Sequence, residues 1–127
     1  MRQWRTRRRV GKPLHTVVEA PVYLGNAASA SVWDEERDYI VDVFAADPSQ
    51  GDEVRGSGGV RKARVAGRGK GKSGGYRVMA AYVDEDAPVY LLSMLSKGDR
   101  ANFSDKEVAA MKKVTAEIKN MIRRRRR

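Results

Sequence analysis

Basic side chains without acidic neighbours are concentrated in the middle of this chain, where residues 55–77 carry eight lysines and arginines and no acid. Lys62 and Arg64 are two positions apart in a predicted strand, so they project from the same face of a sheet. Arg77, in the next predicted strand, could join them. Three converging cations repel one another unless a polyanion binds there, or unless each pairs with an acid of the preceding predicted helix or turn. The sequence leaves both interpretations open.

A glycine-rich loop separates these two strands, and residues 66–73 (AGRGKGKS) match a relaxed phosphate-binding loop. Such a loop cradles phosphates with its own amides and with those of the helix that follows it. Here a predicted strand follows instead, which argues against nucleotide hydrolysis. The cations of the loop then belong either to a solvated segment or to a finger that grips RNA phosphates; they are Arg68, Lys70 and Lys72.

Other groups that commonly carry out catalysis are few. The chain has no cysteine and a single histidine, His15, so a thiolate metal site and a ribonuclease with paired histidines are both excluded. We expect His15 at the surface, where the first predicted strand begins. Three consecutive acids, residues 84–86, fall in a predicted hairpin turn and do not resemble a metal site. The sequence therefore predicts neither a metal nor a cofactor.

The hydropathy pattern predicts the elements that carry these residues. Pro21 indicates that the first strand lies at an edge or ends early. Three consecutive strands between two helices indicate an α+β fold, in which helices pack on a small antiparallel sheet of about four strands. The predicted elements are a strand over 15–23, a helix over 27–46, a turn-rich loop over 49–59, strands over 60–66, 76–83 and 88–96, and a helix after the capping box at residues 104–107 (SDKE).

The net charge of +10 comes mostly from the two ends of the chain. Residues 1–14 carry six basic side chains and no acid, and residues 123–127 are five arginines. We predict a disordered basic arm over 1–14, one folded domain over 15–122 and an Arg-rich tail over 123–127. No apolar run is long enough to span a membrane, and the first residues lack the apolar core of a secretory signal. The expected location is the cytoplasm, without a membrane partner.

Several segments of the chain share an ordered pattern with one protein family. They are residues 58–64 (GGVRKAR), 69–78 (GKGKSGGYRV), 88–92 (PVYLL) and 95–100 (LSKGDR), with Asp47-Pro48 and Gly51-Asp52 before them and Phe103-Ser104 after them. Together they cover roughly residues 16–120. In this order they resemble the RelE/HigB-like toxins of type II toxin–antitoxin systems.

The resemblance implies a microbial-ribonuclease-like α+β fold with a four-strand sheet. It implies the activity of an mRNA interferase, a metal-independent endoribonuclease that cuts messenger RNA on the ribosome and so inhibits translation. In that chemistry the ribose 2′-OH attacks the adjacent phosphate, which leaves a cyclic phosphate and a free 5′-OH. The implied partners are the ribosome, its mRNA and a cognate antitoxin protein, often one with a helix-turn-helix domain.

The same resemblance assigns roles to individual residues. Arg77 would stabilise charge on the scissile phosphate, and Lys62 and Arg64 would orient the RNA backbone. Because arginine stays protonated, Lys62 is the better candidate to take the 2′-OH proton. Lys97 and Arg100 would bind RNA or protonate the leaving oxygen. The predicted catalytic residues are thus Lys62, Arg64 and Arg77, and the predicted RNA-binding residues are Arg61, Arg68, Lys70, Lys72, Lys97 and Arg100.

The chain also departs from the family pattern. Some members carry a catalytic tyrosine, or an acid and a histidine, near the end of the last strand, where this chain has Phe103 and Ser104. The general acid is therefore left unassigned. Two other functions stay open: a non-enzymatic ParE-like toxin that inhibits gyrase, and a nucleic-acid- or ribosome-binding protein that acts through its basic ends.

Overall fold

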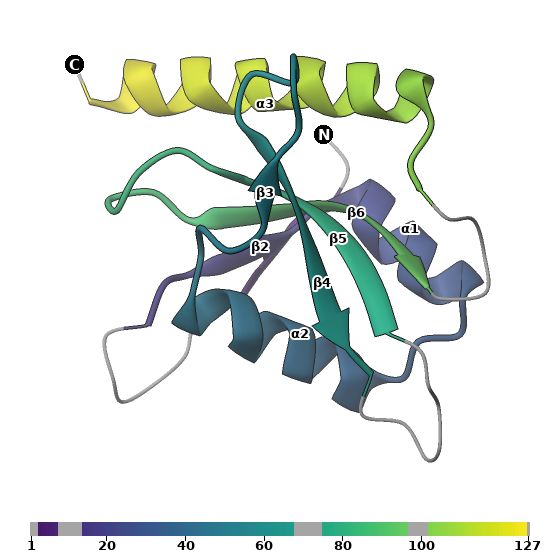
Figure 1. The fold of residues 1–127 in the computed structure, drawn as a ribbon. Coiled ribbons are helices and arrows are strands. Elements are labelled where there is room, and N and C mark those ends of the chain that lie inside the picture. The colour runs from purple at the N-terminus through teal and green to yellow at the C-terminus, as the bar shows by residue number, and fades with distance from the viewer. Residues whose placement is uncertain (1–2, 8–13, 68–74, 97–101, 127) are drawn as a thin grey trace.

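A single sheet with helices on both faces organises the molecule (Figure 1). The computed structural model describes residues 3–7, 14–67, 75–96 and 102–126. In chain order the elements are β1 (Arg5–Arg7), β2 (Val17–Glu19), α1 (Pro21–Ser29), α2 (Asp34–Ala46), β3 (Asp52–Glu53), β4 (Val60–Ala66), β5 (Gly75–Tyr82), β6 (Val89–Ser96) and α3 (Asp105–Arg125). The strands lie in the order β1-β2-β6-β5-β4-β3, and only β2 and β6 pair in parallel among them.

The predicted α+β class is confirmed, and so are the three strands β4, β5 and β6 that form the centre of the sheet. The strand count differs from the prediction, because the sheet has six strands instead of about four. The two additional strands, β1 and β3, are only three and two residues long. Their residues were expected in the basic arm and in the turn-rich loop.

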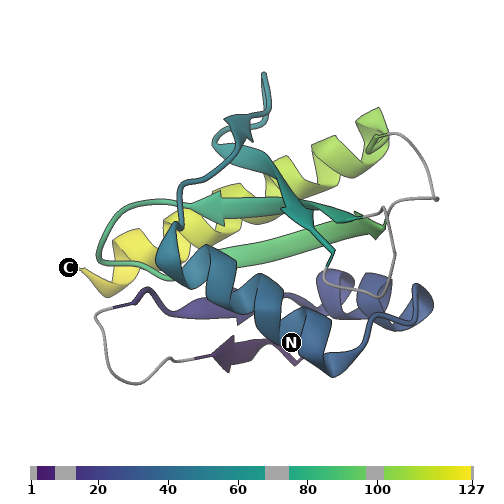
Figure 2. The same ribbon diagram turned by 60° about the horizontal axis from the view of Figure 1, so that its bottom comes forward.

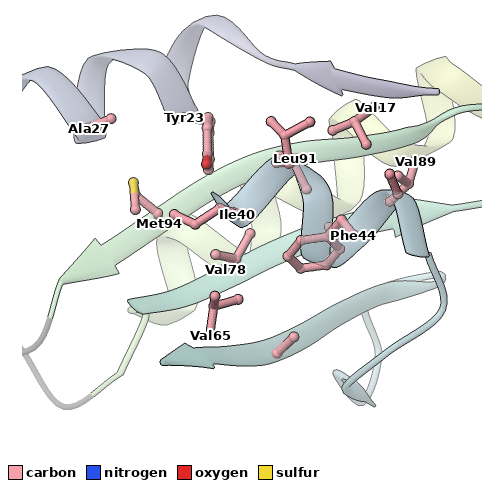
Figure 3. Close-up of a cluster of buried hydrophobic side chains, with 14 residues drawn as sticks. Val17, Tyr23, Ala27, Ile40, Phe44, Val65, Val78, Val89, Leu91 and Met94 are labelled. Atoms are coloured by element: carbon pink, nitrogen blue, oxygen red, sulfur yellow. The ribbon is translucent and has the colours of Figure 1, made fainter. Parts of the chain in front are cut away.

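The helices form two layers, with α1 and α2 on one face of the sheet and α3 across the other (Figures 1 and 2). Side chains alternate between these faces along β4. On β4, Ala63 and Val65 pack in the core under α1 and α2, whereas Val60 packs in the core under α3. Figure 3 shows the first of these cores, where Ile40 and Phe44 of α2 lie against the strands. The face that a β4 residue occupies therefore decides which helix layer it meets.

The prediction of one helix over 27–46 is wrong in its first part, because two helices occupy this region. Pro21 belongs to the first turn of α1 rather than to a strand, and proline is well suited there since the first helical amides have no acceptor in the helix. Ser31 lies in the connection between α1 and α2 and adopts a left-handed backbone conformation, with a φ of 54°. The strand predicted over 15–23 is accordingly shorter, and β2 stops at Glu19.

The basic N-terminal arm is ordered over its described residues 3–7, so the predicted disorder is wrong there. β1 pairs with β2, and Trp4 packs edge-on against Tyr90 with ring centroids 5.9 Å apart. Arg7 Nη1 donates to the buried Glu19 Oε1 at 3.0 Å. At the other end of the chain, Arg123, Arg124 and Arg125 continue α3. Part of the excess positive charge is therefore held on folded elements.

Gly51 allows the chain to pass close to β4 before it forms β3. Its φ is +91°, and an added Cβ would lie 2.4 Å from the Lys62 carbonyl oxygen. We expect Gly51→Ala to lower the free energy of unfolding by about 2–4 kcal/mol, because left-handed strain and a backbone clash combine. Gly56 is a matched control, since its φ is +73° but the space around it is open. Gly56→Ala should lose only about 1–2 kcal/mol in urea unfolding; equal losses would contradict the clash at Gly51.

The start of α3 confirms the predicted capping box. Ser104 Oγ accepts from the Glu107 amide at 3.1 Å, and Glu107 Oε1 accepts from the Ser104 amide at 2.7 Å. Phe103, immediately before the cap, is buried in the core between α3 and the sheet. Together these contacts fix the position at which the chain enters α3. None of the described helices is both long and apolar enough to cross a bilayer.

Candidate phosphate-binding site on the sheet

Lys62, Arg64 and Arg77 lie on the face of the sheet that α3 crosses. Lys62 and Arg64 alternate with Ala63 and Val65, which point to the opposite layer. Arg77 precedes Val78, which also belongs to that opposite layer. Lys62 and Arg77 are half-buried and Arg64 is exposed. The structure thus brings the three predicted catalytic cations to one face of two adjacent strands.

Arg64 and Arg77 are direct neighbours across the β4–β5 pair, because their Cα atoms are register partners. Lys62 follows two residues away on the same strand. Like charges directly opposite each other destabilise a sheet. The pair lies near the end of the sheet where β4 and β6 stop and β5 begins. The fold therefore holds two guanidinium groups together against their own repulsion.

Acids do not neutralise this arginine pair within the residues that the structure describes. The ion pairs found there join Arg7 and Arg37 to acids of β2 and α2, and Arg126 to Asp84. The acids of α2 lie on the other side of the sheet, as the position of that helix shows (Figure 2). The interpretation that the acids of this helix balance Arg64 and Arg77 is not supported.

Asp52 is placed beside the cluster by the short strand β3. It stands directly opposite Lys62 in the β3–β4 register, so the two side chains share a face. No ion pair joins them in the described part of the chain; the Lys62 ammonium group contacts Asn102 instead. The sequence suggested residue 52 only as a neutralising partner. The structure adds it as an exposed carboxylate at the edge of the cluster.

Asn102 is a contact that the sequence analysis missed. Lys62 Nζ donates to Asn102 Oδ1 at 3.0 Å, and the same oxygen accepts from the Phe103 amide at 2.9 Å. Because the Phe103 side chain is buried and Ser104 caps α3, the amide oxygen of Asn102 is held in place from the helix side. The one available signal was an asparagine two residues before a predicted cap, which does not reveal a lysine 40 positions away.

Arg61 does not join the cluster, although the sequence analysis included it among RNA-binding residues. It lies on the opposite face of β4, where its Nη2 donates to the Gly51 carbonyl oxygen at 2.6 Å. Tyr76, the residue before Arg77, also lies on that opposite face and packs against the α2 layer. Burial, and then the nearby Glu36 carboxylate, raise the pKa of the Tyr76 hydroxyl. Neither side chain is placed to act on a ligand bound at Arg64 and Arg77.

His15 is also distant from the cluster. Its Nε2 lies 3.1 Å from the hydroxyl oxygen of Tyr82, and the two rings meet edge-on. Tyr82 ends β5 and Arg77 lies near its start, about 16 Å away at the usual rise of a strand. His15 is half-buried rather than fully exposed at the surface. The single histidine therefore cannot supply a proton or a base at the cation cluster.

Five of the predicted RNA-binding residues lie outside the described residues: Arg68, Lys70, Lys72, Lys97 and Arg100. The strands that lead toward these segments, β4, β5 and β6, are described up to the end of the sheet that carries Arg64 and Arg77. The described part of the site therefore consists of Lys62, Arg64 and Arg77, with Asn102 and Asp52 beside Lys62.

This arrangement is suited to binding a phosphodiester. Each guanidinium group presents a planar fork that matches two oxygens of one phosphate, and Lys62 adds a compact positive charge. Fixed cations of this kind also stabilise negative charge that develops during a reaction at phosphorus. The described residues include no group of three or more histidine, aspartate and glutamate side chains that could hold a metal ion.

Comparison with protein-family models supports the resemblance found in the sequence. The model described as the RelE toxin of the RelE / RelB toxin-antitoxin system matches residues 43–125. The matched region runs from the end of α2 through β3, β4, β5 and β6 to the end of α3, and so includes every described residue of the cation cluster. On this match, which spans well over half of the sequence, the chain belongs to the RelE toxin family.

Proposed function

We propose that this protein is the toxin of a type II toxin–antitoxin pair and that it acts as a ribosome-dependent mRNA endoribonuclease. The observation that carries the proposal is the adjacent pair Arg64 and Arg77, which shares its face with Lys62 and has no acid partner within the described residues. A repulsive pair of this kind is explained by an anionic substrate. Membership of the RelE toxin family supports RNA as that substrate.

In the proposed reaction, Arg64 and Arg77 bind the scissile phosphate and orient it for attack by the neighbouring 2′-OH. The 2′-oxygen forms a bond to phosphorus and gives up its proton to a water molecule, while the Lys62 ammonium group orients the RNA backbone. The bond from phosphorus to the 5′-oxygen then breaks, and this oxygen takes up a proton from solvent. The products are a 2′,3′-cyclic phosphate and a free 5′-OH. Negative charge on the phosphate oxygens is greatest between these two steps, so the two guanidinium groups contribute most there.

The partners follow from the same proposal. Messenger RNA on a translating ribosome is the substrate, so the toxin acts in the cytoplasm. A cognate antitoxin binds the chain and neutralises it. Lys97, Arg100, Arg68, Lys70 and Lys72 extend the contact with RNA beyond the cluster. The proposed reaction uses no metal and no cofactor.

The proposal is tested with purified protein and ribosomes programmed with a defined message. We expect cleavage of the message on the ribosome, little or no cleavage of the same message alone, and cyclic phosphate at the new 3′ ends. Cleavage that requires added divalent ions at the chemical step, or that leaves a 5′-phosphate, would contradict the mechanism. An intact message together with inhibited gyrase would contradict the nuclease function itself.

Asn102 should act as a positioning residue for Lys62. Asn102→Ala removes the acceptor of the Lys62 ammonium group, and we expect the cleavage rate to fall about tenfold or more, as for the loss of a hydrogen bond to a charged group. Asn102→Asp keeps an oxygen acceptor and should retain more activity than the alanine variant. Because Asn102 is exposed and its remaining contact is one hydrogen bond from the Phe103 amide, both variants should lose no more than about 1 kcal/mol of stability. Equal activity of Asn102→Ala and wild type would contradict this role.

A further inference from the structure

α3 carries a second group of cations, which lies apart from the cluster on the sheet. The helix is 21 residues long, so it spans about 31 Å. It lies along the outside of the molecule (Figure 1). From residue 112 to residue 126 the helix and its cap have seven lysines and arginines and a single acid, Glu117. Four of these seven residues are called the α3 cations here: Lys112, Lys113, Arg124 and Arg125.

The α3 cations are all exposed. The other cations between residues 112 and 126 have partners: Lys119 Nζ donates to the Gly58 carbonyl oxygen, Arg123 Nη1 donates to Asn120 Oδ1 at 3.0 Å, and Arg126 is paired with Asp84 at 2.7 Å. The Arg126 guanidinium lowers the pKa of Asp84 to about 2. By contrast, no hydrogen bond or ion pair to an acid is found for the α3 cations among the described residues.

Stabilisation of the helix itself accounts for two of the α3 cations at most, Arg124 and Arg125 in the last turn. Positive charges near a helix C-terminus interact favourably with the helix dipole, but the effect is limited to the last turn. Lys112 and Lys113 lie in the first half of α3, far from that turn. Lys113 and Arg124 are separated by three helical turns, which places them on one line about 16 Å apart. That line runs opposite the buried positions of the helix, Met111, Thr115, Ile118 and Ile122.

A membrane surface does not fit these cations. A basic helix that binds in a bilayer interface needs a free apolar face beside its charges. In α3 that face is occupied, because Met111, Ile118 and Ile122 are 6%, 5% and 8% exposed and pack on the sheet. The large hydrophobic residues that are exposed in the described chain, Leu14, Val22 and Trp33, lie outside α3. An aqueous polyanion is therefore the better partner.

We propose that the α3 cations bind the phosphate backbone of double-stranded RNA, at a site separate from the cleavage site. The rigid helix presents its charges at fixed spacing, and α3 has no aromatic side chain on which the bases of a single strand could stack. Double-stranded RNA is recognised mainly through its shape and its phosphates. This inference extends the proposed function, since a folded RNA held by α3 would anchor the toxin while a single strand enters the cluster at Lys62.

The test uses the full chain with Arg77→Ala, so that binding is measured independently of cleavage. Fluorescence anisotropy with a 20-base-pair RNA duplex, at a series of KCl concentrations, gives the salt dependence of binding. We expect Lys113→Gln with Arg124→Gln to reduce the log–log slope by about 2 and to weaken binding about tenfold at 50 mM KCl, because each lost phosphate contact removes about 0.9 from the slope. Circular dichroism should show an unchanged fold, since both residues are exposed.

A matched control removes the same charge elsewhere. Arg5→Gln with Arg55→Gln changes two exposed arginines outside α3 and should leave the slope within about 0.5 of the parent value. Equal slope losses in both double variants would overturn the proposal, because binding would then depend only on net charge. Tighter binding to vesicles of anionic lipid than to the duplex, lost in the α3 variant, would overturn it in favour of a membrane surface. Absence of message cleavage by the wild-type chain, together with the expected duplex binding, would refute the nuclease alone.

Discussion

Replacement of Arg77 by alanine is expected to lower the rate of mRNA cleavage by about 100- to 1,000-fold, the usual effect of removing one fixed donor to a developing negative charge. Stability should respond in the opposite direction. Because Arg77 stands directly opposite Arg64, its removal relieves a like-charge contact and should leave the free energy of unfolding unchanged or raised by up to about 1 kcal/mol. Cleavage of ribosome-bound message and urea unfolding of the same preparation measure the two effects.

The combination of the two effects is what distinguishes a functional cation from a structural one. Arg64→Ala should behave in the same way, since it is the other member of the repulsive pair. Arg55→Ala is the control, because it removes an exposed arginine from the turn between β3 and β4 and should change neither property. A large loss of stability in Arg77→Ala, with cleavage reduced only in proportion to the folded fraction, would assign Arg77 to the fold instead.

Replacement of Glu19 by alanine is expected to have the largest effect on stability. Glu19 is fully buried, accepts from Arg37 Nη2 at 3.0 Å and Nε at 3.2 Å, and accepts from Arg7 at 3.0 Å. Removal of one partner from a buried charge network usually costs about 3–5 kcal/mol, because the opposite charges remain without compensation. For a chain of this size that corresponds to a fall of about 10 °C or more in the melting temperature.

Asp38→Ala is the matched control for Glu19→Ala. Asp38 also binds Arg7, but its side chain is 56% exposed, so its loss should cost no more than about 1 kcal/mol. Thermal unfolding followed by circular dichroism compares the two variants. Glu19 also holds β1 to the sheet through Arg7, so Glu19→Ala should increase the rate of proteolytic cleavage near residues 3–7. Equal melting temperatures for the two variants would contradict the importance of the buried network.

Local sequence signals predicted the parts of the fold that depend on neighbouring residues. The alternation of Lys62 and Arg64 with Ala63 and Val65 predicted β4 and a shared face for its two cations. The capping box formed by Ser104 and Glu107 predicted the start of α3, because it depends only on residues within one helical turn. The same pattern left open whether Arg77 joins them, and the β4–β5 register places it opposite Arg64.

Contacts between distant parts of the chain were not accessible in this way. The first residues carry enough charge to be typical of disorder, yet Arg7 is ordered by Glu19, 12 positions away, and by Asp38, 31 positions away. The contact between Lys62 and Asn102 spans 40 positions and leaves no pattern in either segment. The start of α1 at Pro21 was ambiguous, because proline is common both in the first turn of a helix and at the edge of a sheet.

The most direct test of the central claim is to map RNA 5′ ends in cells after induced expression of the chain. Two copies of one reporter message should be present, one translated and one without its start codon. New 5′ ends are expected within the coding region of the translated copy only, and none are expected when Arg77→Ala is expressed. Growth arrest without new 5′ ends in either copy would show that the chain does not act by cutting messenger RNA.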